Sequence, residues 1–590
     1  MAGCKLVLSS SPPVPETHIY IVGRDELLTN LDNLLQQHRI VHLQGEPGAG
    51  RSAVASEYRR RYGRRYAYIW TLRASCRTQL IWDFVAIRTA LDVPLASFQD
   101  QPDVVQRTRA ALAERDDYLL IFEDVGHADD LRDFLPVGAG RVMLTTTGDV
   151  DVPGVRVALP SMTSAQLLTA AAANDAAGHA LDDRRALDRC NGNPLAAQLL
   201  FAARTPDAAM QVGQSAALGL QAVLPIALRH VQHESAAAWS LLSALAWFNC
   251  DEVGSSLLRA LLACVAPEQS GLLDDLVGRA LVNRCGDSIR MHRSVQTAVL
   301  AMCTAEQRSQ AYTAALRAVH QSFPAVVSDW RVFAQCAELL PHVERMACAQ
   351  ELDDAHPVIA ARLLNRAALY LVCRSWFSMA EPLAAHAVRL GEKAQGLGKE
   401  ELCRFRNNLG LALRGAGKLQ QACVQATLAH QGTVEALGPL HPTVGTRANT
   451  LAMMHTVLGN IEEALRYNRE AYHNSVVNSG RNDERYPVRA HNYGQSLRQL
   501  GRMGQGRRLL ASALLRARRV HGEAHPRVAF YSNALGEALL EDGYLQPARH
   551  YVQAAATLNL DFYGDQEFMP KQVATDGNLL RLAEAERKLG

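Results

Sequence analysis

The chain has 590 residues, of which 48% are hydrophobic and 20% are charged, and its mean hydropathy is -0.09. This length accommodates several domains, and the composition is too apolar for a disordered protein. The 61 basic and 59 acidic side chains give a formal net charge of +2, which excludes a global attraction to nucleic acid or to an anionic membrane. No apolar run reaches the roughly 18 residues of a membrane helix. Twelve cysteines without a CxxC pair are typical of a reducing compartment, so we expect a cytoplasmic protein.

Short apolar runs alternate with helical patterns from Ile19 to about Pro160. Such alternation is typical of a parallel, doubly wound α/β sheet. We therefore predict an α/β domain over residues 19–160, preceded by a disordered tail at residues 1–18. The predicted strands lie at residues 40–43, 66–70, 118–122, 141–144 and 155–159.

A glycine-rich segment, GEPGAGRS at residues 45–52, follows the first predicted strand and precedes a helical pattern. Glycines in this context allow backbone N–H groups to close around phosphate oxygens at a helix N-terminus. Arg51 stands where the phosphate-binding motif has Lys, and Arg cannot replace a compact ammonium group between two phosphates. We therefore expect nucleotide binding to persist better than catalysis. The predicted cofactor-binding residues of this loop are Gly45, Gly48, Ala49, Gly50, Arg51, Ser52 and Ala53.

The strand predicted at residues 118–122 continues into two acids, Glu123 and Asp124. An apolar strand that ends in two carboxylates has the form of a Walker B segment, in which the first acid holds Mg²⁺ and the second polarises the attacking water. We therefore predict Ser52 and Glu123 as magnesium ligands and Asp124 as the candidate catalytic residue.

Four further segments stand in a recognisable order: VGRD at 22–25, RVMLTTT at 141–147, GNPL at 192–195 and MHR at 291–293. With the phosphate loop, they resemble the NB-ARC (STAND) family of signal-transducing ATPases. The resemblance implies that Val22 and Arg24 contact adenine, that Pro194 packs on the base, and that His292 meets the β-phosphate of ADP. It also implies a P-loop domain at 19–160, a helical domain at 161–210 and a winged-helix domain at 211–304, with a helical connector at 305–353.

Four residues depart from the family pattern: Arg51 replaces Lys, Glu123 replaces Asp, Thr147 replaces a phosphate-sensing Arg, and Arg293 replaces Asp. These changes weaken groups that bind the γ-phosphate or its metal, whereas most ADP contacts are present. We therefore expect ADP or ATP with Mg²⁺ as ligands and at most a slow ATPase. The winged-helix segment has no basic cluster, so nucleic acid binding is not expected.

After about residue 161 the sequence predicts almost only helices, and over residues 354–590 it repeats with a period of 42 residues. Small residues recur at fixed positions, as stacked helical hairpins require where two helices cross closely. The pattern resembles tetratricopeptide repeats (TPR) of the kinesin-light-chain type and predicts an all-α superhelix of about five repeats. One of the recurring small positions carries Ala380, Ala422, Ala464, Gly506 and Ala548.

A polar residue recurs on the first helix of each repeat. Asparagine is a poor helix former, so its recurrence needs a reason, and its amide can match a peptide bond. In the resembling family this position faces a groove and grips the backbone of a bound peptide. The alternative is an asparagine that bridges neighbouring helices of the solenoid. The predicted groove residues are Asn365, Asn407, Asn449, His491 and Asn533.

Together, these features predict a nucleotide-gated switch in signal transduction. In the resembling family, ADP holds the three N-terminal domains closed, the repeats sense a partner, and exchange for ATP opens the molecule to oligomerise. We therefore expect a protein or peptide ligand and a nucleotide-dependent homo-oligomer. The alternative is a TPR adaptor or scaffold whose nucleotide domain is degenerate and structural.

Overall fold

The structure is a computed structural model, and its contacts divide the chain into two units that we describe separately. The first unit includes Pro102–Leu363 and the chain up to Val93, and the second includes Leu364–Gly590. The predicted tail at 1–18 and Val22 lie outside the described residues. The structure describes residues 23–74, 77–91, 93, 101–126, 129–172, 184–203, 206–250, 252–267, 269, 271–349, 356–479, 484–563, 578, 579, 581 and 583.

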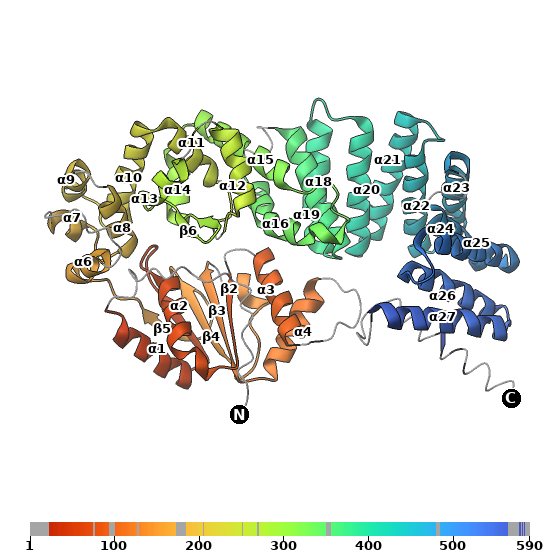
Figure 1. Cartoon of the computed structure of the whole chain (residues 1–590), viewed down its shortest axis with the longest axis horizontal. Coiled ribbons are helices and arrows are strands. Elements are labelled where there is room, and N and C mark those ends of the chain that lie inside the picture. The colour runs from red at the N-terminus through yellow and green to blue at the C-terminus, as the bar shows by residue number, and fades with distance from the viewer. Residues whose placement is uncertain are drawn as a thin grey trace. The chain divides into compact units, whose positions relative to one another are not determined.

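The first unit begins with a five-stranded parallel sheet in the order β2-β3-β4-β1-β5 (Figure 1), which confirms the predicted parallel α/β fold. Because every pair is parallel, the strands end at one edge, where the glycine-rich loop follows β1. The second strand begins at Tyr68 rather than at Tyr66, because the N–H of Tyr66 donates at 3.1 Å to the carbonyl of Gly63 in the preceding 3₁₀ turn (Gly63–Arg65). The strands are β1 Ile40–Gln44, β2 Tyr68–Arg73, β3 Tyr118–Val125, β4 Arg141–Thr146 and β5 Val155–Ala158.

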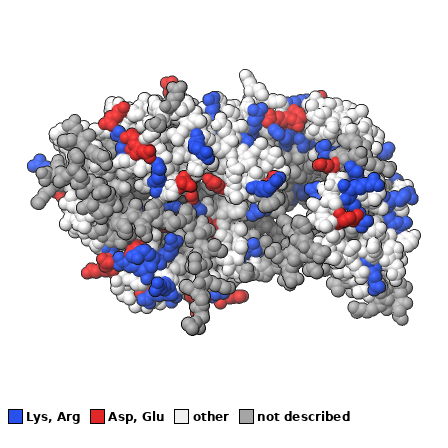
Figure 2. All heavy atoms as spheres, in the orientation of Figure 1, with Lys and Arg blue, Asp and Glu red and all other residues white. Residues whose placement is uncertain are grey.

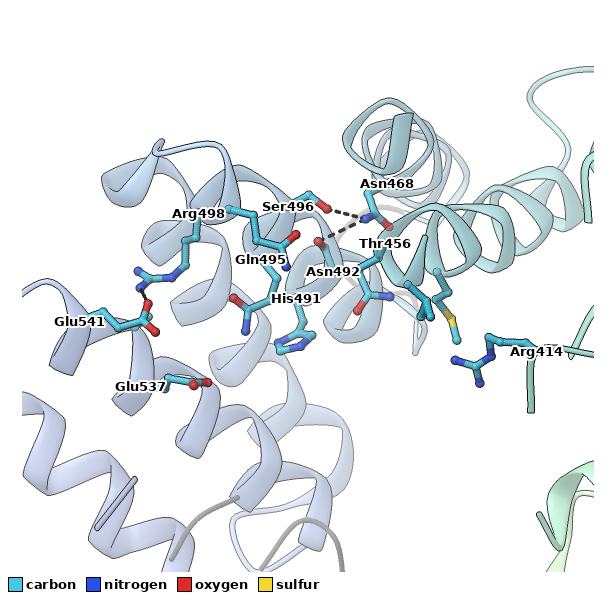
Figure 3. A pocket seen from close by; sticks show the side chains of 14 residues that line it. Arg414, Thr456, Asn468, His491, Asn492, Gln495, Ser496, Arg498, Glu537 and Glu541 are labelled. Carbon is cyan, nitrogen blue, oxygen red and sulfur yellow. Dashed lines mark hydrogen bonds and ion pairs between the residues drawn. The ribbon is translucent and has the colours of Figure 1, made fainter. Parts of the chain in front are cut away.

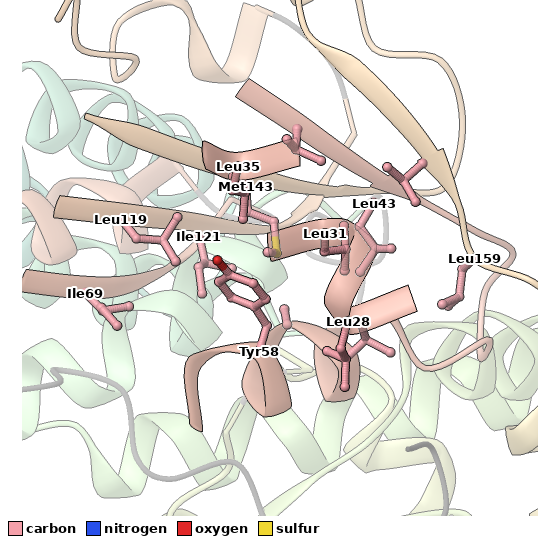
Figure 4. Close-up of a cluster of buried hydrophobic side chains, with 14 residues drawn as sticks. Leu28, Leu31, Leu35, Leu43, Tyr58, Ile69, Leu119, Ile121, Met143 and Leu159 are labelled. Atoms are coloured by element: carbon pink, nitrogen blue, oxygen red, sulfur yellow. The ribbon is translucent and has the colours of Figure 1, made fainter. Parts of the chain in front are cut away.

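A buried apolar cluster fixes two helices on one face of this sheet (Figure 4). Helix α1 (Asp25–Gln37) contributes leucines at helical spacing, and α2 (Arg51–Tyr62) contributes Tyr58, which is fully buried. Each fully buried leucine adds about 1.5–3 kcal/mol of stability. The cluster therefore holds the start of α2 at the end of β1. Helices α3 (Arg77–Ala90), α4 (Gln101–Ala113) and α5 (Asp129–Arg132) complete this part of the chain.

The rest of the first unit is helical apart from an antiparallel hairpin of β6 (Asn283–Cys285) and β7 (Ser288–Arg290). Helix α14 (Arg293–Met302) follows this hairpin directly. The residue bounds proposed for the helical domain, winged-helix domain and connector stay predictions. The remaining helices are α6 Ser164–Ala172, α7 Arg184–Arg189, α8 Pro194–Ala203, α9 Pro206–Gln214, α10 Leu220–Glu234, α11 Ala236–Leu245, α12 Ser255–Val265, α13 Leu272–Gly278, α15 Ala305–Ser322 and α16 Phe333–Ala347.

Five helix pairs occupy residues 357–563, so the predicted all-α repeat region is confirmed. The recurring small residues lie where the helices cross. Ala422 and Ala464 are fully buried, and a Cβ atom at Gly506 would lie 2.6 Å from the carbonyl oxygen of Gly494. The pairs are α18 Pro357–Cys373 with α19 Phe377–Lys393, α20 Lys399–Gly415 with α21 Leu419–Leu437, α22 Pro442–Val457 with α23 Ile461–Ser479, α24 Tyr486–Gln499 with α25 Met503–His521, and α26 Pro526–Glu541 with α27 Leu545–Tyr563.

The turn inside each pair ends the first helix with a left-handed residue. Gly417 has φ +77°, and the N–H of Lys418 donates to the carbonyl of Leu413 at 2.9 Å. This is the Schellman arrangement, which satisfies the last carbonyls of a helix. Ser375 takes the same place in the first pair with φ +61°. The turns therefore repeat in conformation even where glycine is absent.

Among the described residues, no helix is both long and apolar enough to cross a membrane. On the face shown in Figure 2, positive and negative side chains lie interspersed among those residues, in keeping with the net charge of +2.

Candidate functional site

A cavity of about 660 Å³ lies where the glycine-rich loop meets β7 and α14. One wall comes from the loop, α2 and the strand ends, and the other comes from residues 250–301. Three arginines and one acid lie among the described residues that line it, so the cavity is electropositive. The lining residues are Pro47, Gly48, Gly50, Arg51, Ser52, Ala53, Asp124, Val125, Gly126, Thr147, Cys250, Asn283, Cys285, Arg290, Met291, His292, Arg293, Ser294, Thr297, Ala298 and Ala301.

The loop conformation leaves the N-terminus of α2 open toward this cavity. Gly48 and Gly50 have φ +80° and +96°, a region that side-chain-bearing residues rarely adopt. Gly50 occupies the N-cap without a side-chain cap, and the first backbone bond of the helix runs from Val54 N to Gly50 O. The preceding N–H groups therefore lack helical partners, which makes this end of α2 suited to an anion.

Arg51 is bound by protein groups on both sides of its guanidinium. Nη1 donates to the carbonyl of Gly45, and Nη2 donates to Oδ1 of Asp124 at 3.0 Å. The Arg51 side chain is 8% exposed, so this ion pair is partly desolvated. Asp124 is the only acid among the described residues that line the cavity. A cation placed beside Asp124 would therefore compete with Arg51.

The backbone directs Asp124, rather than Glu123, to the cavity. The pairing of β3 with β4 shifts between Phe122 and Val125, and Asp124 adopts φ +53° within this irregular stretch. Its N–H donates to Oγ1 of Thr145 at 2.9 Å, which holds the bulge. Glu123 does not line the cavity.

Arg24 tethers the loop instead of lining the cavity. Its guanidinium donates to the carbonyls of Pro160 at 2.6 Å and Ala49 at 3.4 Å. The residue is 2% exposed, and burial lowers the pKa of its guanidinium. The adenine contact implied for Arg24 stays a prediction.

Asn193 joins the loop to α8. Its Nδ2 donates to the carbonyl of Pro47 at 2.9 Å, and its Oδ1 accepts from the N–H of Ala196 at 3.1 Å, which caps the helix. The N–H of Leu195 donates to the carbonyl of Gly48 at 3.3 Å. Sequence reasoning singled out Pro194 here but missed Asn193, although an Asn directly before a helix-initiating Pro is a typical N-cap signal.

His292 caps α14 with its ring. Nδ1 accepts from the N–H of Ser294 at 3.1 Å, so a neutral ring carries its proton on Nε2. Burial lowers the pKa of His292 to about 4, with Asp124 opposing this effect and Arg51 and Arg293 adding to it. The ring is therefore neutral at pH 7 and can still donate one hydrogen bond.

The structure brings together some of the predicted nucleotide-site residues but not all. Gly48, Gly50, Arg51, Ser52, Ala53, Asp124 and His292 line the cavity, whereas Arg24, Gly45, Ala49, Glu123 and Pro194 do not. Sequence reasoning missed Arg290, which lies on β7 and whose buried Nε has no hydrogen-bond partner among the described residues. Arg293, which in the sequence is a departure from a family pattern, also lines the cavity. The roles assigned to all these residues stay predictions.

The predicted groove residues of the repeats fall into two groups. In the first group, Oδ1 accepts from the Nδ2 of an asparagine further along the chain, in an inter-repeat bond that we call a rung. The rungs are Asn408 to Asn365 at 2.9 Å, Asn492 to Asn449 at 2.8 Å and Asn578 to Asn533 at 3.2 Å. In the second group, Oδ1 of Asn407 and Nδ1 of His491 are buried without a hydrogen-bond partner among the described residues. The rungs are the bridge that the sequence left open as an alternative.

A second cavity, of about 550 Å³, lies over the first helices of four consecutive pairs (Figure 3). His491 and Gln495 extend into the space from α24, with Glu537 and Glu541 at one side and Arg414 at the other. Its lining residues are Arg414, Met453, Thr456, Val457, Asn468, His491, Asn492, Gln495, Ser496, Arg498, Gln499, Glu537, Ala538 and Glu541.

Fold and site together define a P-loop-type α/β domain followed by a helical-repeat solenoid. Residues 488–560 match the family model of the tetratricopeptide repeat. No curated protein sequence matches the chain.

Among solved structures, the chain is similar to a Signal Transduction ATPase with Numerous Domains (STAND) protein with a tetratricopeptide repeat sensor from Pyrococcus horikoshii. The TM-score is 0.51 at 15% identity, over 98% of this chain and 86% of that chain. The chain therefore shares the fold of that protein, and the predicted fold class, an α/β domain followed by a helical-repeat region, is confirmed.

Two further structures match a part of the chain. BtubC (BKLC) from P. vanneervenii has a TM-score of 0.34 at 20% identity, over 41% of this chain and 94% of that chain. Putative kinesin light chain TPR-like repeats from Podosopora anserina have a TM-score of 0.32 at 16% identity, over 35% of this chain and 98% of that chain.

Proposed function

We propose that the chain is a nucleotide-gated regulatory switch that senses a protein or peptide partner through its repeats. The observation that carries this proposal is the shared lining of the first cavity. The loop and α2 form one wall, and β7 with α14 forms the other. A nucleotide held there would touch both walls, so its binding energy would depend on how they are arranged. A ligand shifts a conformational equilibrium only through such differential contacts.

The residues fit the phosphates of ADP or ATP. The open N-terminus of α2, Arg51 and Arg290 supply donors and positive charge, and the neutral His292 adds a donor on Nε2. When bound, a nucleotide supplies the anionic phosphates that these groups would hold. The Gly48 backbone must lack a side chain, because a Cβ there would lie 2.9 Å from Asn193 Oδ1.

The fit for Mg²⁺ is weaker. Ser52 lines the cavity and could ligate the ion, but the acid beside it, Asp124, is paired with Arg51 at 3.0 Å. We therefore assign Asp124, rather than Glu123, to the metal side of the site. Competition with Arg51 makes hydrolysis slow, and Arg51→Lys should increase it, since a compact ammonium group is the usual partner of the phosphates.

The test is to denature the purified full-length chain and to identify the released nucleotide by chromatography. We expect ADP or ATP in near-stoichiometric amount. His292→Ala and Arg290→Gln should reduce it, whereas Arg259→Gln should not, because Arg259 lies outside the cavity on α12. Absence of nucleotide, together with no binding of millimolar ADP, would refute the switch.

One observation favours a second candidate, a TPR adaptor whose nucleotide domain is structural. Arg51 is neutralised by Asp124 and by the carbonyl of Gly45, so the loop is held by protein groups alone. The two functions differ in response to nucleotide. A switch changes its partner affinity or its oligomeric state when ADP is exchanged for ATP, which size-exclusion chromatography with light scattering measures, and an adaptor does not.

A further inference from the structure

A third cavity, of about 270 Å³, lies inside the first unit between the sheet and α16. Residues of β2 and α3 form one wall, and residues 249 and 252 with α16 form the other. None of the described residues lines both this cavity and the first one. Pockets for drug-sized ligands have volumes of roughly 300–1,000 Å³, so an occupant of the third cavity must be small.

The charges of the third cavity are not balanced. Among the described residues that line it, three acids stand against one arginine, and His342 is neutral because burial lowers its pKa to about 4. Asp83 accepts the backbone N–H of Arg73 at 3.1 Å, whereas Arg73 Nη1 and Glu252 Oε2 are 3.9 Å apart. Glu338 forms no hydrogen bond or ion pair with the described residues, and burial and the charge of Glu252 raise its pKa. Glu252 and Glu338 therefore leave negative charge that a cation would neutralise.

Helix α16 adds an acceptor of a different kind. Pro341 lies inside this helix and has no N–H, so the carbonyl of Ala337 cannot accept the usual helical bond from the residue four positions ahead. Ala337 and Pro341 both line the cavity. Trp82 lines it from α3, and an aromatic ring attracts a cation. Carboxylates, a carbonyl without its helical donor and an aromatic ring are all groups that suit a positively charged ligand.

A primary ammonium group fits these acceptors better than a metal ion. Among the described residues, no group of three or more His, Cys, Asp or Glu side chains could hold a metal ion. An ammonium group has three N–H donors and no acceptor. The cavity offers it the carboxylates of Glu252 and Glu338 and the carbonyl of Ala337.

The wall that carries Glu252 also reaches the first cavity. Cys250 lines that cavity, and its carbonyl accepts the N–H of Met291 at 3.3 Å. Val253 exchanges two backbone hydrogen bonds with Ile289 of β7, at 2.9 and 3.1 Å. An occupant of the third cavity would therefore hold, against β2 and α3, the same stretch of chain that is bonded to β7 beside the first cavity.

We propose that the third cavity is a regulatory site for a small organic cation whose primary ammonium group binds between Glu252 and Glu338. The alkyl chain of the cation packs against Trp82. The bound cation favours the arrangement in which β7 and α14 close the first cavity, so its affinity is coupled reciprocally to that of a nucleotide. The cation site is independent of the proposed nucleotide switch, and only the coupling rests on it.

Isothermal titration calorimetry of the full-length chain with n-butylammonium chloride tests the site, and n-butanol is the neutral counterpart. We expect the ammonium ion to bind and the alcohol not to bind. Glu338→Gln should weaken binding of the ammonium ion at least about tenfold, because a charge-assisted hydrogen bond is lost. Glu344→Gln is the matched control, since it makes the same change on α16 outside the cavity and should keep the affinity.

Pro341→Ala tests the carbonyl separately from the charges. The new N–H would occupy the carbonyl of Ala337, so affinity for n-butylammonium should fall while the melting temperature does not, because proline is unfavourable inside a helix. Pro225→Ala is the control, since it replaces a proline inside α10 that lies outside the third cavity, and it should leave the affinity unchanged.

The outcomes separate the cation site from the proposed function. Equal binding of n-butanol, unchanged affinity in Glu338→Gln, or equal affinities in Pro341→Ala and Pro225→Ala would overturn the site. Saturating n-butylammonium should increase the affinity for ADP about fivefold or more, and an unchanged affinity for ADP would overturn the coupling. A chain that binds the cation but no ADP would refute the switch and the coupling and would support the site.

Discussion

The crossing of α24 and α25 offers a sharp test of why small residues recur in the repeats. Gly506 and Gly504 lie two residues apart on α25, yet their surroundings differ. A Cβ at Gly506 would lie 2.6 Å from the carbonyl oxygen of Gly494 and would also meet Cγ of Arg498, whereas a Cβ at Gly504 meets nothing within 4 Å. The same substitution by Ala should therefore have opposite effects at the two positions.

The magnitude follows from two opposing terms. Ala is preferred over Gly in a helix by about 1 kcal/mol, and overpacking a filled site costs about 1–3 kcal/mol. The neighbour of Gly506 is backbone, which cannot rotate away, so the upper part of that range applies. Gly506→Ala should therefore destabilise the local structure by about 1–2 kcal/mol, and Gly504→Ala should stabilise it by up to about 1 kcal/mol.

Hydrogen exchange measured by mass spectrometry on the full-length chain is the suitable assay, because it reports local stability in a multidomain protein. Amides of α24 and α25 should exchange roughly 5- to 30-fold faster in Gly506→Ala and more slowly in Gly504→Ala. Equal behaviour of the two variants, or slower exchange in Gly506→Ala, would show that close helix approach is not what requires a small residue here.

Three further predictions concern other parts of the chain. Asn193→Ala should lower the free energy of unfolding by about 2–3 kcal/mol, since it loses both the helix cap and the bond to Pro47, whereas Asn193→Asp keeps the cap and should lose about 1 kcal/mol in urea titrations. Burial lowers the pKa of His342 to about 4, so the unfolded chain binds more protons than the folded chain between pH 7 and pH 5. The free energy of unfolding should therefore fall by about 2 kcal/mol over this range. His342→Gln should remove that part of the pH dependence. Ser375→Gly should stabilise the first repeat by about 0.5–1 kcal/mol because φ is +61°, and Gly417→Ser should destabilise the second by a similar amount; no difference between these variants in chemical denaturation would contradict the role of the left-handed turn.

Periodic features of the sequence predicted the fold well. The five strands were visible as apolar runs, and the repeat length of 42 residues placed the small residues that the structure buries, such as Ala422 and Ala464. Glycines also recur every 42 residues in the turns from Gly417 to Gly543, because a left-handed residue is needed where these first helices end. These features are local or regular, and therefore leave a pattern in one sequence.

The candidate site depended on contacts that leave no such pattern. The orientation of Asp124 follows from a shift in strand pairing, and a strand ending in two acids does not indicate which one turns toward the loop. Arg51 was visible as a departure, but its ion pair with Asp124 joins residues 73 apart in the chain. The rungs have a trace in the sequence, because the position after each groove residue alternates between asparagine and other residues. The alternation can be interpreted only once the structure shows that this asparagine bonds to a residue of the preceding repeat.

Histidine side chains cap helices both in the repeats and beside the first cavity. His441 and His525 cap α22 and α26 by accepting an N–H two residues ahead on Nδ1, at 3.3 and 3.1 Å, and each is followed directly by a proline, Pro442 and Pro526. His292 caps α14 in the same way. In the repeats this cap only starts a helix. In the first cavity it also fixes a ring that lines the cavity together with Arg51 and Asp124. Because the cap engages Nδ1, a neutral ring keeps its proton on Nε2. A group bound to Nε2 would therefore be linked through the ring to the first turn of α14. If His292 meets the β-phosphate of ADP, as the family resemblance implies, phosphate binding would act on α14 through this residue.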